Sequence, residues 1–371
     1  MTPVRSLMGW TLAALMALLM AGGLGDVAPG AWTSLTAGVD HVLLSGTRVT
    51  LAAVRRFVPV AAPKAPSGLP PGLVLGYFDD PATDPDAVAL LASYRSVING
   101  IIPFWYTVAA DGSVTGDTNP AVLAYARRRH WYTLALVRNM AGASVFGPLL
   151  ASPAAKQRAV ADMLALVEKY GYSGINLDWE GIAPSDRAAF SAFVATLAKI
   201  FHAHHYYVTL SVPAETTDEP DNAWTGAYDY RALGRSADLL ILMAYDEHNV
   251  ASAAGPIAAS EWVKAVLSYA ISTVAPGKIV LGVPGYGYDW SAAGTMALSW
   301  RQAENLAEQY HRPTGGGHFT YVAGGQLHTV WFENAETLLQ NLTLAAGYEV
   351  RGMALWRLGI EDPKLWALLQ S

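Results

Sequence analysis

The chain has 371 residues, a formal net charge of −6, and a composition that is 52% hydrophobic and only 15% charged. This composition excludes a disordered protein, and the acidic balance leaves no basic surface for nucleic acid. The absence of cysteine excludes disulfides, thiolate metal sites and cysteine nucleophiles. A chain of this length holds one large domain or two ordinary ones.

The first part of the chain predicts export and a linker. Residues 7–24 follow Arg5 and form an apolar run without a charge, which suits a signal peptide or an uncleaved membrane anchor. We therefore expect residues 1–25 to direct the protein to the periplasm, the exterior or the membrane surface; the alternative is a buried helix of the main domain. Residues 26–71 predict a linker with one helix near 51–57, and its Pro/Ala-rich end at 61–71 is typical of a stiff spacer.

Apolar runs of strand length alternate with helical patterns from residue 73 onward. Eight strands are predicted, at residues 73–78, 97–107, 131–138, 174–180, 207–213, 239–245, 279–285 and 351–357. Helical spacing of apolar residues occurs at 154–170, 185–204, 260–274 and 334–346. Nearly continuous apolar strands alternating with helices indicate a buried parallel sheet, and eight such units predict an α/β fold of the (β/α)8 TIM-barrel type over residues 72–371. An open doubly wound sheet is the alternative, but no glycine-rich dinucleotide fingerprint follows the first strand.

One long connection interrupts this alternation. Residues 289–331 lie between the seventh strand and its helix, and loops of this length are usually functional or carry structure of their own. We expect a helix and a hairpin here, flanking the cleft. The glycines at 315–317 predict a flexible turn, because no lysine and helix start follow them as a phosphate-binding loop requires.

Polar and aromatic residues collect at the ends of the predicted strands. They are Tyr77, Asp79, Trp105, Tyr106, Arg138, Asn139, Asp178, Glu180, Glu215, Tyr245, Asp246, Tyr286, Tyr288, Trp356 and Arg357. The site of a TIM barrel lies at the carboxyl ends of its strands. We therefore expect these side chains to converge on one mouth of the barrel.

Residues 174–181 carry the most informative pattern. In a strand, Asn176, Asp178 and Glu180 share one face, and a buried face with an amide and two acids costs stability unless it serves a site. Two carboxylates divide acid and base roles only if their surroundings separate their pKa values, and Glu180, longer and last on the strand, is the better general acid. Neighbours on one strand cannot bracket a scissile bond from about 5 Å apart, as paired carboxylates do. The alternative is a substrate that supplies its own nucleophile, such as the acetamido oxygen of an N-acetyl sugar.

Residues 174–180 resemble the fourth-strand signature of glycoside hydrolase family 18, the retaining chitinase-like enzymes. Residues 243–246, 282–287 and 352–356 resemble the sixth, seventh and eighth strand motifs of that family, in the right order. The continuations at 245–248, 330–333 and 356–359 are most similar to the branch that contains spore-cortex and peptidoglycan N-acetylglucosaminidases.

The resemblance implies roles for individual residues. Glu180 is implied to be the acid/base, Asp178 the group that orients the acetamide and stabilises an oxazolinium ion, and Tyr245 a hydrogen-bond partner of the acetamide. Trp356 is implied to form the floor of the sugar site, and Asp246 to line the same subsite.

This chain departs from the family pattern at two positions. Ser173 and Asn176 stand where the family usually has acids, and the change at Asn176 removes a carboxylate that could exchange a proton with Asp178. Asn176 can still hydrogen-bond to Asp178, and we include it among the substrate-binding residues. The change bears on the pH profile and the rate more than on the reaction class.

Further aromatic residues are candidates for stacking on sugar rings. They are Tyr77, Trp105, Tyr106, Tyr286, Tyr288 and Trp290, and core packing is the alternative for each of them, as it is for Tyr245 and Trp356. For the two acids the alternative is a structural hydrogen-bonded pair. The histidines at 202, 204 and 205 close a helix, where positive charge suits the helix dipole, so we predict no metal site there.

The sequence therefore predicts an exported retaining glycosidase. It would hydrolyse β-1,4-linked N-acetylglucosamine polysaccharide of the peptidoglycan or chitin type, by substrate-assisted catalysis and without metal or cofactor. A catalytically silent, lectin-like barrel is the main alternative, and a barrel hydrolase of sugars without an acetamide is another. Endo or exo cleavage and the oligomeric state stay open.

Overall fold

The computed structural model describes residues 41–44, 47–50, 72–81, 83–139 and 142–370. The predicted export segment at 1–25 and the helix expected near 51–57 lie outside the described residues. Across the described ranges, no helix has the length and apolar character needed to span a bilayer. Within the predicted linker, β1 (His41–Leu44) pairs with β2 (Thr47–Thr50) as an antiparallel hairpin that we did not predict.

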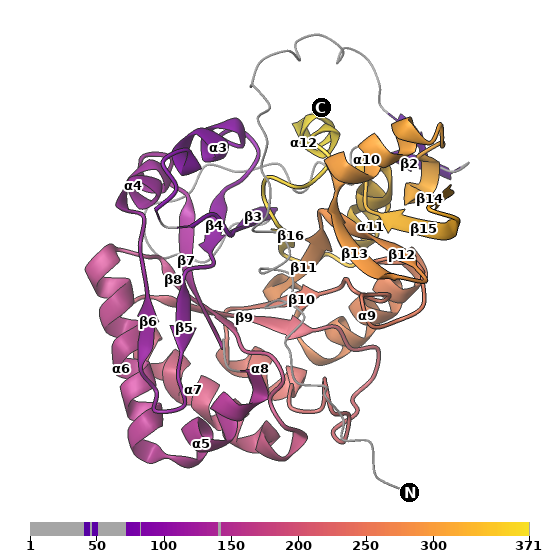
Figure 1. Ribbon diagram of the computed structural model, residues 1–371. Coiled ribbons are helices and arrows are strands. Elements are labelled where there is room, and N and C mark those ends of the chain that lie inside the picture. Colours follow the sequence, from indigo (N-terminus) through magenta and orange to yellow (C-terminus); the bar gives the residue numbers. More distant parts are fainter. Residues whose placement is uncertain (1–40, 45–46, 51–71, 82, 140–141, 371) are drawn as a thin grey trace, which may run out of the picture.

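Eight parallel strands form a closed barrel, which confirms the predicted fold (Figure 1). In chain order they are β3 (Leu73–Phe78), β4 (Gly100–Pro103), β7 (Tyr132–Asn139), β8 (Gly174–Asp178), β9 (Tyr207–Pro213), β10 (Leu239–Met243), β11 (Ile279–Pro284) and β16 (Gly352–Trp356). Each strand pairs with the next along this order, and β16 pairs with β3 to close the ring.

Alternate residues of each strand belong to two separate apolar clusters. Leu134 and Leu136 of β7 pack inside the barrel, whereas Ala135 and Val137 pack outward against the helices. This alternation follows from the two faces of a strand. The inward rows are mostly apolar; Tyr132 and Tyr207 pack edge-on at the amino ends of β7 and β9, and further polar and aromatic residues gather toward the carboxyl ends of the strands.

Helices cover the outside of the barrel. They are α3 (Ala87–Ser93), α4 (Pro120–Arg128), α5 (Phe146–Ala151), α6 (Pro153–Tyr170), α7 (Arg187–Ala203), α8 (Tyr230–Ser236), α9 (Ser260–Thr273), α11 (Ala335–Gly347) and α12 (Lys364–Gln370). The four helices predicted from apolar spacing are α6, α7, α9 and α11, each with ends within two residues of the prediction. The ends of α6 follow local chemistry, because the Ser152 hydroxyl accepts from the Ala155 N–H and Gly171 closes the helix at a φ of 67°.

The single strand predicted over residues 97–107 is wrong in one respect. The structure ends the barrel strand at Pro103 and starts β5 (Tyr106–Val108), which pairs with β7 and forms a hairpin with β6 (Val114–Gly116). Proline has no N–H to continue a ladder, and the apolar run on both sides of Pro103 hides this break in the sequence.

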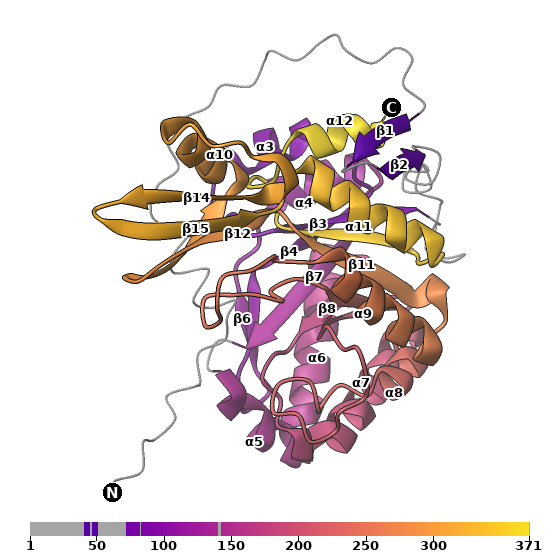
Figure 2. The same cartoon turned by 90° about the vertical axis from the view of Figure 1, so that its right-hand side faces the viewer.

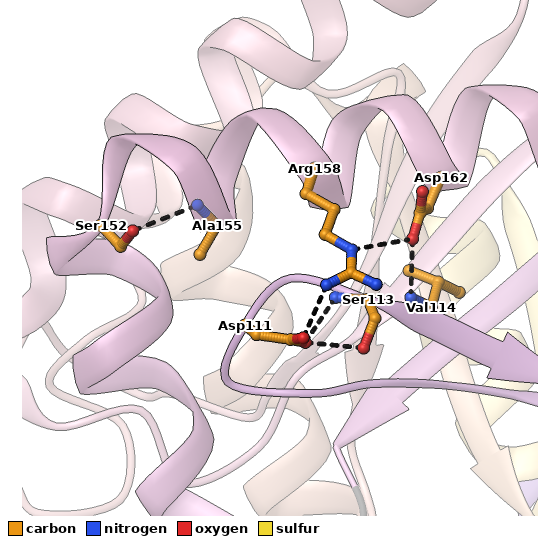
Figure 3. A network of polar contacts seen from close by, with 7 residues as sticks. All are labelled: Asp111, Ser113, Val114, Ser152, Ala155, Arg158 and Asp162. Atoms are coloured by element: carbon orange, nitrogen blue, oxygen red, sulfur yellow. Dashed lines mark hydrogen bonds and ion pairs between the residues drawn. The ribbon is translucent and has the colours of Figure 1, made fainter.

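The turn of the β5–β6 hairpin is fastened to helix α6 (Figure 3). Asp111 accepts from the backbone N–H and hydroxyl of Ser113, at 2.9 and 2.6 Å, and pairs with Arg158 at 2.6 Å. Asp162, one turn further along α6, accepts from the Val114 N–H at 3.2 Å. The ion pairs are exposed and therefore add little stability, and the hydrogen bond from the Val114 N–H to Asp162 is the further link between the hairpin and the helix.

The connection between β11 and α11 forms a small antiparallel sheet. Its strands are β12 (Tyr286–Ser291), β13 (Gly294–Ser299), β14 (His318–Ala323) and β15 (Gln326–Phe332), with α10 (Trp300–Gln309) packed on one face. The predicted helix and hairpin are both present, but the β12–β13 hairpin was not predicted. The glycines at 315–317 form a short 3-10 turn. Figure 2 shows this sheet projecting from one side of the barrel.

Candidate active site

A cavity of about 360 Å³ opens at the carboxyl ends of the barrel strands. It is lined by Tyr77, Asp178, Glu180, Pro213, Ala214, Trp224, Met243, Tyr245, Asp246, Glu247, Asn249, Trp262, Tyr286 and Trp356. Seven of these are predicted site residues, namely Tyr77, Asp178, Glu180, Tyr245, Asp246, Tyr286 and Trp356. The mouth of the barrel thus brings most of the predicted site together.

Trp105 lies outside this lining. Its indole N–H donates to the Asp80 carbonyl at 2.8 Å, and its ring packs edge-on against Phe78 at 6.1 Å between centroids. The structure therefore places this ring against the β3 end rather than in the cavity.

Asn176 also lies outside the lining, fully buried below Asp178. Its amide donates to the Thr209 hydroxyl and accepts from the Ser211 hydroxyl, both at 3.0 Å. The Ser211 oxygen in turn lies 2.7 Å from the Tyr77 hydroxyl. Asn176 thus reaches the cavity through Ser211 and Tyr77, and does not itself line it.

Asp178 is the last residue of β8 and is 5% exposed, and Glu180, two residues beyond the strand, is 7% exposed. Burial raises the pKa of Glu180, and the negative charges of Asp178 and Asp246 raise it further. Burial also raises the pKa of Asp178, but the positive charge of Arg138 and the nearby Ser211 hydroxyl oppose it and leave the value at about 6. Glu180 therefore keeps its proton at a pH where Asp178 is ionised, and this separation suits an acid beside a carboxylate.

Arg138 supplies the positive charge in this part of the barrel. It pairs with Asp178 in the β7–β8 register, and its guanidinium carbon lies 3.9 Å from the centre of the Phe104 ring. It stood at a predicted strand end but was not among the predicted site residues. The signal that could have identified it is its position: Arg138 ends the predicted strand that precedes the one ending in Asp178 and Glu180.

Asp246 is held by two tyrosines of the β12 strand. Its Oδ1 accepts from the hydroxyls of Tyr286 and Tyr288 at 2.7 and 2.8 Å. Burial raises the pKa of Asp246 to about 6, although the two hydrogen bonds from the tyrosines act to lower it. The neighbouring Tyr245 ring packs edge-on to Tyr286 at 6.3 Å, and burial raises the pKa of its phenol, so it stays a hydrogen-bond donor.

Trp356 closes the cavity on the side of β3 and β16. Its ring packs edge-on to Tyr77 at 5.2 Å and to Phe104 at 5.1 Å. These contacts hold the indole in one orientation at the barrel mouth. A flat, fixed aromatic surface of this kind suits the apolar face of a sugar ring.

Two tryptophans of the cavity were not predicted. Trp224 belongs to the connection after β9 and is 41% exposed, and Trp262 belongs to α9. The Asn222 side chain accepts from the backbone N–H groups of Trp224 and Thr225, at 2.9 and 3.1 Å, and so shapes the turn that presents Trp224. A tryptophan in a polar connection that follows a barrel strand is the signal that could have found it.

The sequence profile described as "Glycosyl hydrolases family 18" matches residues 127–361, well over half of the chain. The chain belongs to this family. It is therefore a glycoside hydrolase, and the resemblance inferred from the strand motifs is confirmed.

Several relatives of this family 18 hydrolase cover most of its length. The "Uncharacterized glycosylase YvbX" of Bacillus subtilis (strain 168) is 28% identical over 316 residues, which is 81% of this chain and 91% of that protein. The "Cortical fragment-lytic enzyme" of the same organism is 31% identical over 239 residues, 60% of this chain and 55% of that protein. Among solved structures, the chitinase from Chromobacterium violaceum ATCC 12472 has a TM-score of 0.73 at 32% identity, covering 80% of this chain and 98% of that one.

The histidines at the end of α7 in this family 18 chain contact surface carboxylates. His202 lies 2.9 Å from Asp238, and His204 lies 3.1 Å from Glu168. In the described ranges, no group of three or more histidine, aspartate or glutamate side chains could hold a metal ion.

Glu215 of this family 18 hydrolase provides a test of stability against pH. The residue follows β9 and is 3% exposed; burial and the charge of Asp218 raise its pKa to about 8, against the opposing charge of Arg187. A pKa raised above the unfolded value, about 4.3, contributes stability below that value, and the contribution is lost as the pH rises to about 8. Glu215→Gln should therefore raise the free energy of unfolding by about 1–2 kcal/mol above pH 8 and change it little near pH 4.

Thermal unfolding of Glu215→Gln at the two pH values measures this difference. Glu261→Gln is the control, because the Glu261 side chain is 89% exposed. An equal change in melting temperature at both pH values would contradict the expected result.

Proposed function

We propose that this hydrolase cleaves β-1,4 bonds that follow N-acetylglucosamine, with retention of configuration, by substrate-assisted catalysis. One observation carries the proposal: Glu180, Asp178 and Tyr245 line one cavity with Trp356, where burial and the charge of Asp178 raise the pKa of Glu180. Glu180 and Asp178 stand two residues apart at the end of β8, so they approach a substrate from the same side. Paired carboxylates that bracket a bond come from opposite sides.

The first chemical step breaks the glycosidic bond. Glu180 donates its proton to the leaving oxygen as the bond between that oxygen and C1 breaks. The acetamido oxygen of the same sugar forms a bond to C1 and gives an oxazolinium ion. Asp178 accepts a hydrogen bond from the acetamide N–H and stabilises its positive charge, while the Tyr245 hydroxyl donates to the acetamide oxygen.

The second step restores the enzyme. The Glu180 carboxylate takes a proton from a water molecule, whose oxygen attacks C1 from the side that the leaving group vacated. The bond between C1 and the acetamido oxygen breaks, and the acetamide reforms. Two inversions at C1 give net retention, and Glu180 is protonated again for the next cycle.

We infer that the substrate is peptidoglycan or a related cell-envelope polysaccharide with N-acetyl sugars, and chitin-type glycan is the second candidate. Similarity to a cortical fragment-lytic enzyme supports the first, and similarity to a chitinase supports the second. Mass spectrometry of products from defined muropeptides and from chitin oligosaccharides tests the choice. Release of N-acetylglucosamine-ended fragments is expected; binding of both glycans without turnover over days would contradict the proposed function.

Trp224 should contribute to binding of the sugar chain. Because an exposed indole supplies stacking surface and no proton, Trp224→Ala should raise KM for oligosaccharides about tenfold and leave kcat nearly unchanged. Trp105→Ala is the matched control, since that partly exposed indole lies outside the cavity lining, and it should leave KM unchanged. Steady-state kinetics measure both; the opposite order of KM values would show that the glycan follows the β3 side.

We also propose that the enzyme is exported. The support is the uncharged apolar run at residues 7–24 behind Arg5. Fractionation of cells that produce the full chain tests this, and the mass of the recovered protein tells cleavage from anchoring. Recovery of the uncleaved chain in the cytosol alone would contradict export.

A further inference from the structure

The side chain of Asn139 pairs with the backbone of Glu180. The ladder between β7 and β8 ends with Arg138 opposite Asp178. One residue further along β7, the Asn139 amide nitrogen donates to the Glu180 carbonyl at 2.9 Å, and its Oδ1 accepts from the Glu180 N–H at 3.0 Å. A side-chain amide has the same donor and acceptor as a peptide group, so Asn139 extends the pairing beyond the end of the strand.

These two hydrogen bonds act on different peptide planes. The Glu180 N–H belongs to the plane that joins residues 179 and 180, and the Glu180 carbonyl belongs to the plane that joins 180 and 181. Holding both planes fixes the φ and ψ of Glu180. The direction in which the Glu180 side chain leaves the backbone then follows from these two angles.

The surroundings of this pairing are rigid on one side and bent on the other. The Tyr228 hydroxyl donates to the Trp179 carbonyl at 2.6 Å, and the Trp179 ring stacks on Phe193 at 4.9 Å, outside the barrel. Gly181 has a φ of 73°, where the chain turns away from β8. Asn139, only 4% exposed, bonds to both the peptide plane that joins residues 179 and 180, which Tyr228 also holds, and the plane that joins residues 180 and 181, where the chain turns.

We propose that Asn139 is a positioning residue that sets the line along which Glu180 donates its proton. The inference rests on the proposed function of Glu180 as the general acid. A misplacement of about 1 Å can cost 10²-fold in rate, and rotation of either peptide plane displaces the Glu180 carboxyl. Asn139 thus acts on the leaving oxygen only through Glu180.

Asn119 offers a matched control. It is 7% exposed, its Oδ1 accepts from the N–H groups of Ala121 and Val122 at 3.0 and 3.2 Å, and its amide donates to the Asp84 carbonyl at 3.3 Å. Asn119→Ala and Asn139→Ala therefore both remove a buried amide bonded to the backbone. Asn119 lies outside the cavity lining, at the start of α4.

The test compares two leaving groups in the full-length protein. A sugar needs a proton from Glu180 to leave, whereas 4-nitrophenolate leaves without one. Because Glu180 also acts as the base in the second step, which both substrates share, the first turnover is measured. Asn139→Ala should lower the first-turnover rate of bond cleavage about 100-fold for N-acetylglucosamine oligosaccharides and less than about threefold for 4-nitrophenolate release. Values of KM should stay near those of the wild type, and Asn119→Ala should keep both first-turnover rates.

Equal losses of the first-turnover rate on the two substrates, or first-turnover rates for Asn139→Ala that match those of Asn119→Ala, would overturn the inference. If Asn139→Ala fails to fold, Asn139→Asp replaces it, because the isosteric carboxylate still accepts from the Glu180 N–H but cannot donate to the carbonyl. The same selective loss is expected for it, and equal losses would reject the inference. A wild type that cleaves neither substrate rejects the proposed function itself. If the wild type is active and Glu180→Gln is inactive, the proposed function stands, and a failed comparison for Asn139→Ala rejects only the role of Asn139.

Discussion

Glu180→Gln is expected to lower kcat on N-acetylglucosamine oligosaccharides by about 10²–10⁴-fold, the range that a general acid supplies. Glutamine keeps the size of the side chain but cannot donate a proton to the leaving oxygen. The variant should still bind the oligosaccharide with a Kd close to that of the wild type, because the aromatic residues and Asp178 are unchanged. Reducing-sugar release and isothermal titration measure the two quantities.

Glu215→Gln is the matched control for this variant. Glu215 is also a buried glutamate just beyond a barrel strand, but it lies outside the cavity lining. Its replacement should leave kcat nearly unchanged. Activity of Glu180→Gln equal to that of Glu215→Gln would remove Glu180 from the mechanism and with it the proposed reaction.

Asp178→Asn is expected to lower kcat by about 10²–10³-fold, the cost of losing one group that stabilises charge in the transition state. In contrast to loss of the proton donor, this loss should be similar for oligosaccharides and for 4-nitrophenyl glycosides. Both substrates pass through the oxazolinium ion, which Asp178 stabilises whatever the leaving group. Kinetics on the two substrates therefore separate the roles of the two carboxylates.

The pH profile gives a second readout of Asp178→Asn. In the wild type, activity requires ionised Asp178, with a pKa of about 6, and protonated Glu180, so kcat should rise near pH 6 and fall at higher pH. The charge of Asp178 raises the pKa of Glu180, so removing that charge should move the alkaline fall to lower pH. The rise near pH 6 should disappear. If the alkaline fall of kcat in Asp178→Asn occurs at the same pH as in the wild type, the charge of Asp178 does not raise the pKa of Glu180.

The barrel could be predicted from sequence because parallel strands covered on both faces read as continuous apolar runs. The position of the site followed, since polar and aromatic residues end those runs at one mouth. Depth could not be predicted in the same way. Alternation places Asn176 and Asp178 on one face, but residues two apart lie roughly 6.6 Å from one another along a strand. Asn176 therefore lies deeper in the barrel than Asp178, in the buried network with Thr209 and Ser211.

Some of the features that sequence reasoning missed come from irregular segments. Trp224 lies in the connection between β9 and α8, whose path depends on contacts such as those of Asn222 and not on a periodic pattern. The β12–β13 hairpin begins only two residues after β11 ends at Pro284, and the predicted insertion began only at residue 289, so its first strand was not recognised as a separate element. Asn139 was noted at a strand end, but its pairing with Glu180 depends on where β8 stops, which the sequence placed two residues later.

The anomeric configuration of the first product tests the central claim most directly. Proton NMR spectra recorded during hydrolysis of an N-acetylglucosamine oligosaccharide follow the new reducing end before it mutarotates. Substrate assistance by the acetamide, with Glu180 as the acid/base, predicts that the β-anomer appears first and the α-anomer follows slowly. The α-anomer appearing first would mean that water displaces the leaving group directly, and would contradict the roles assigned to Asp178 and Glu180.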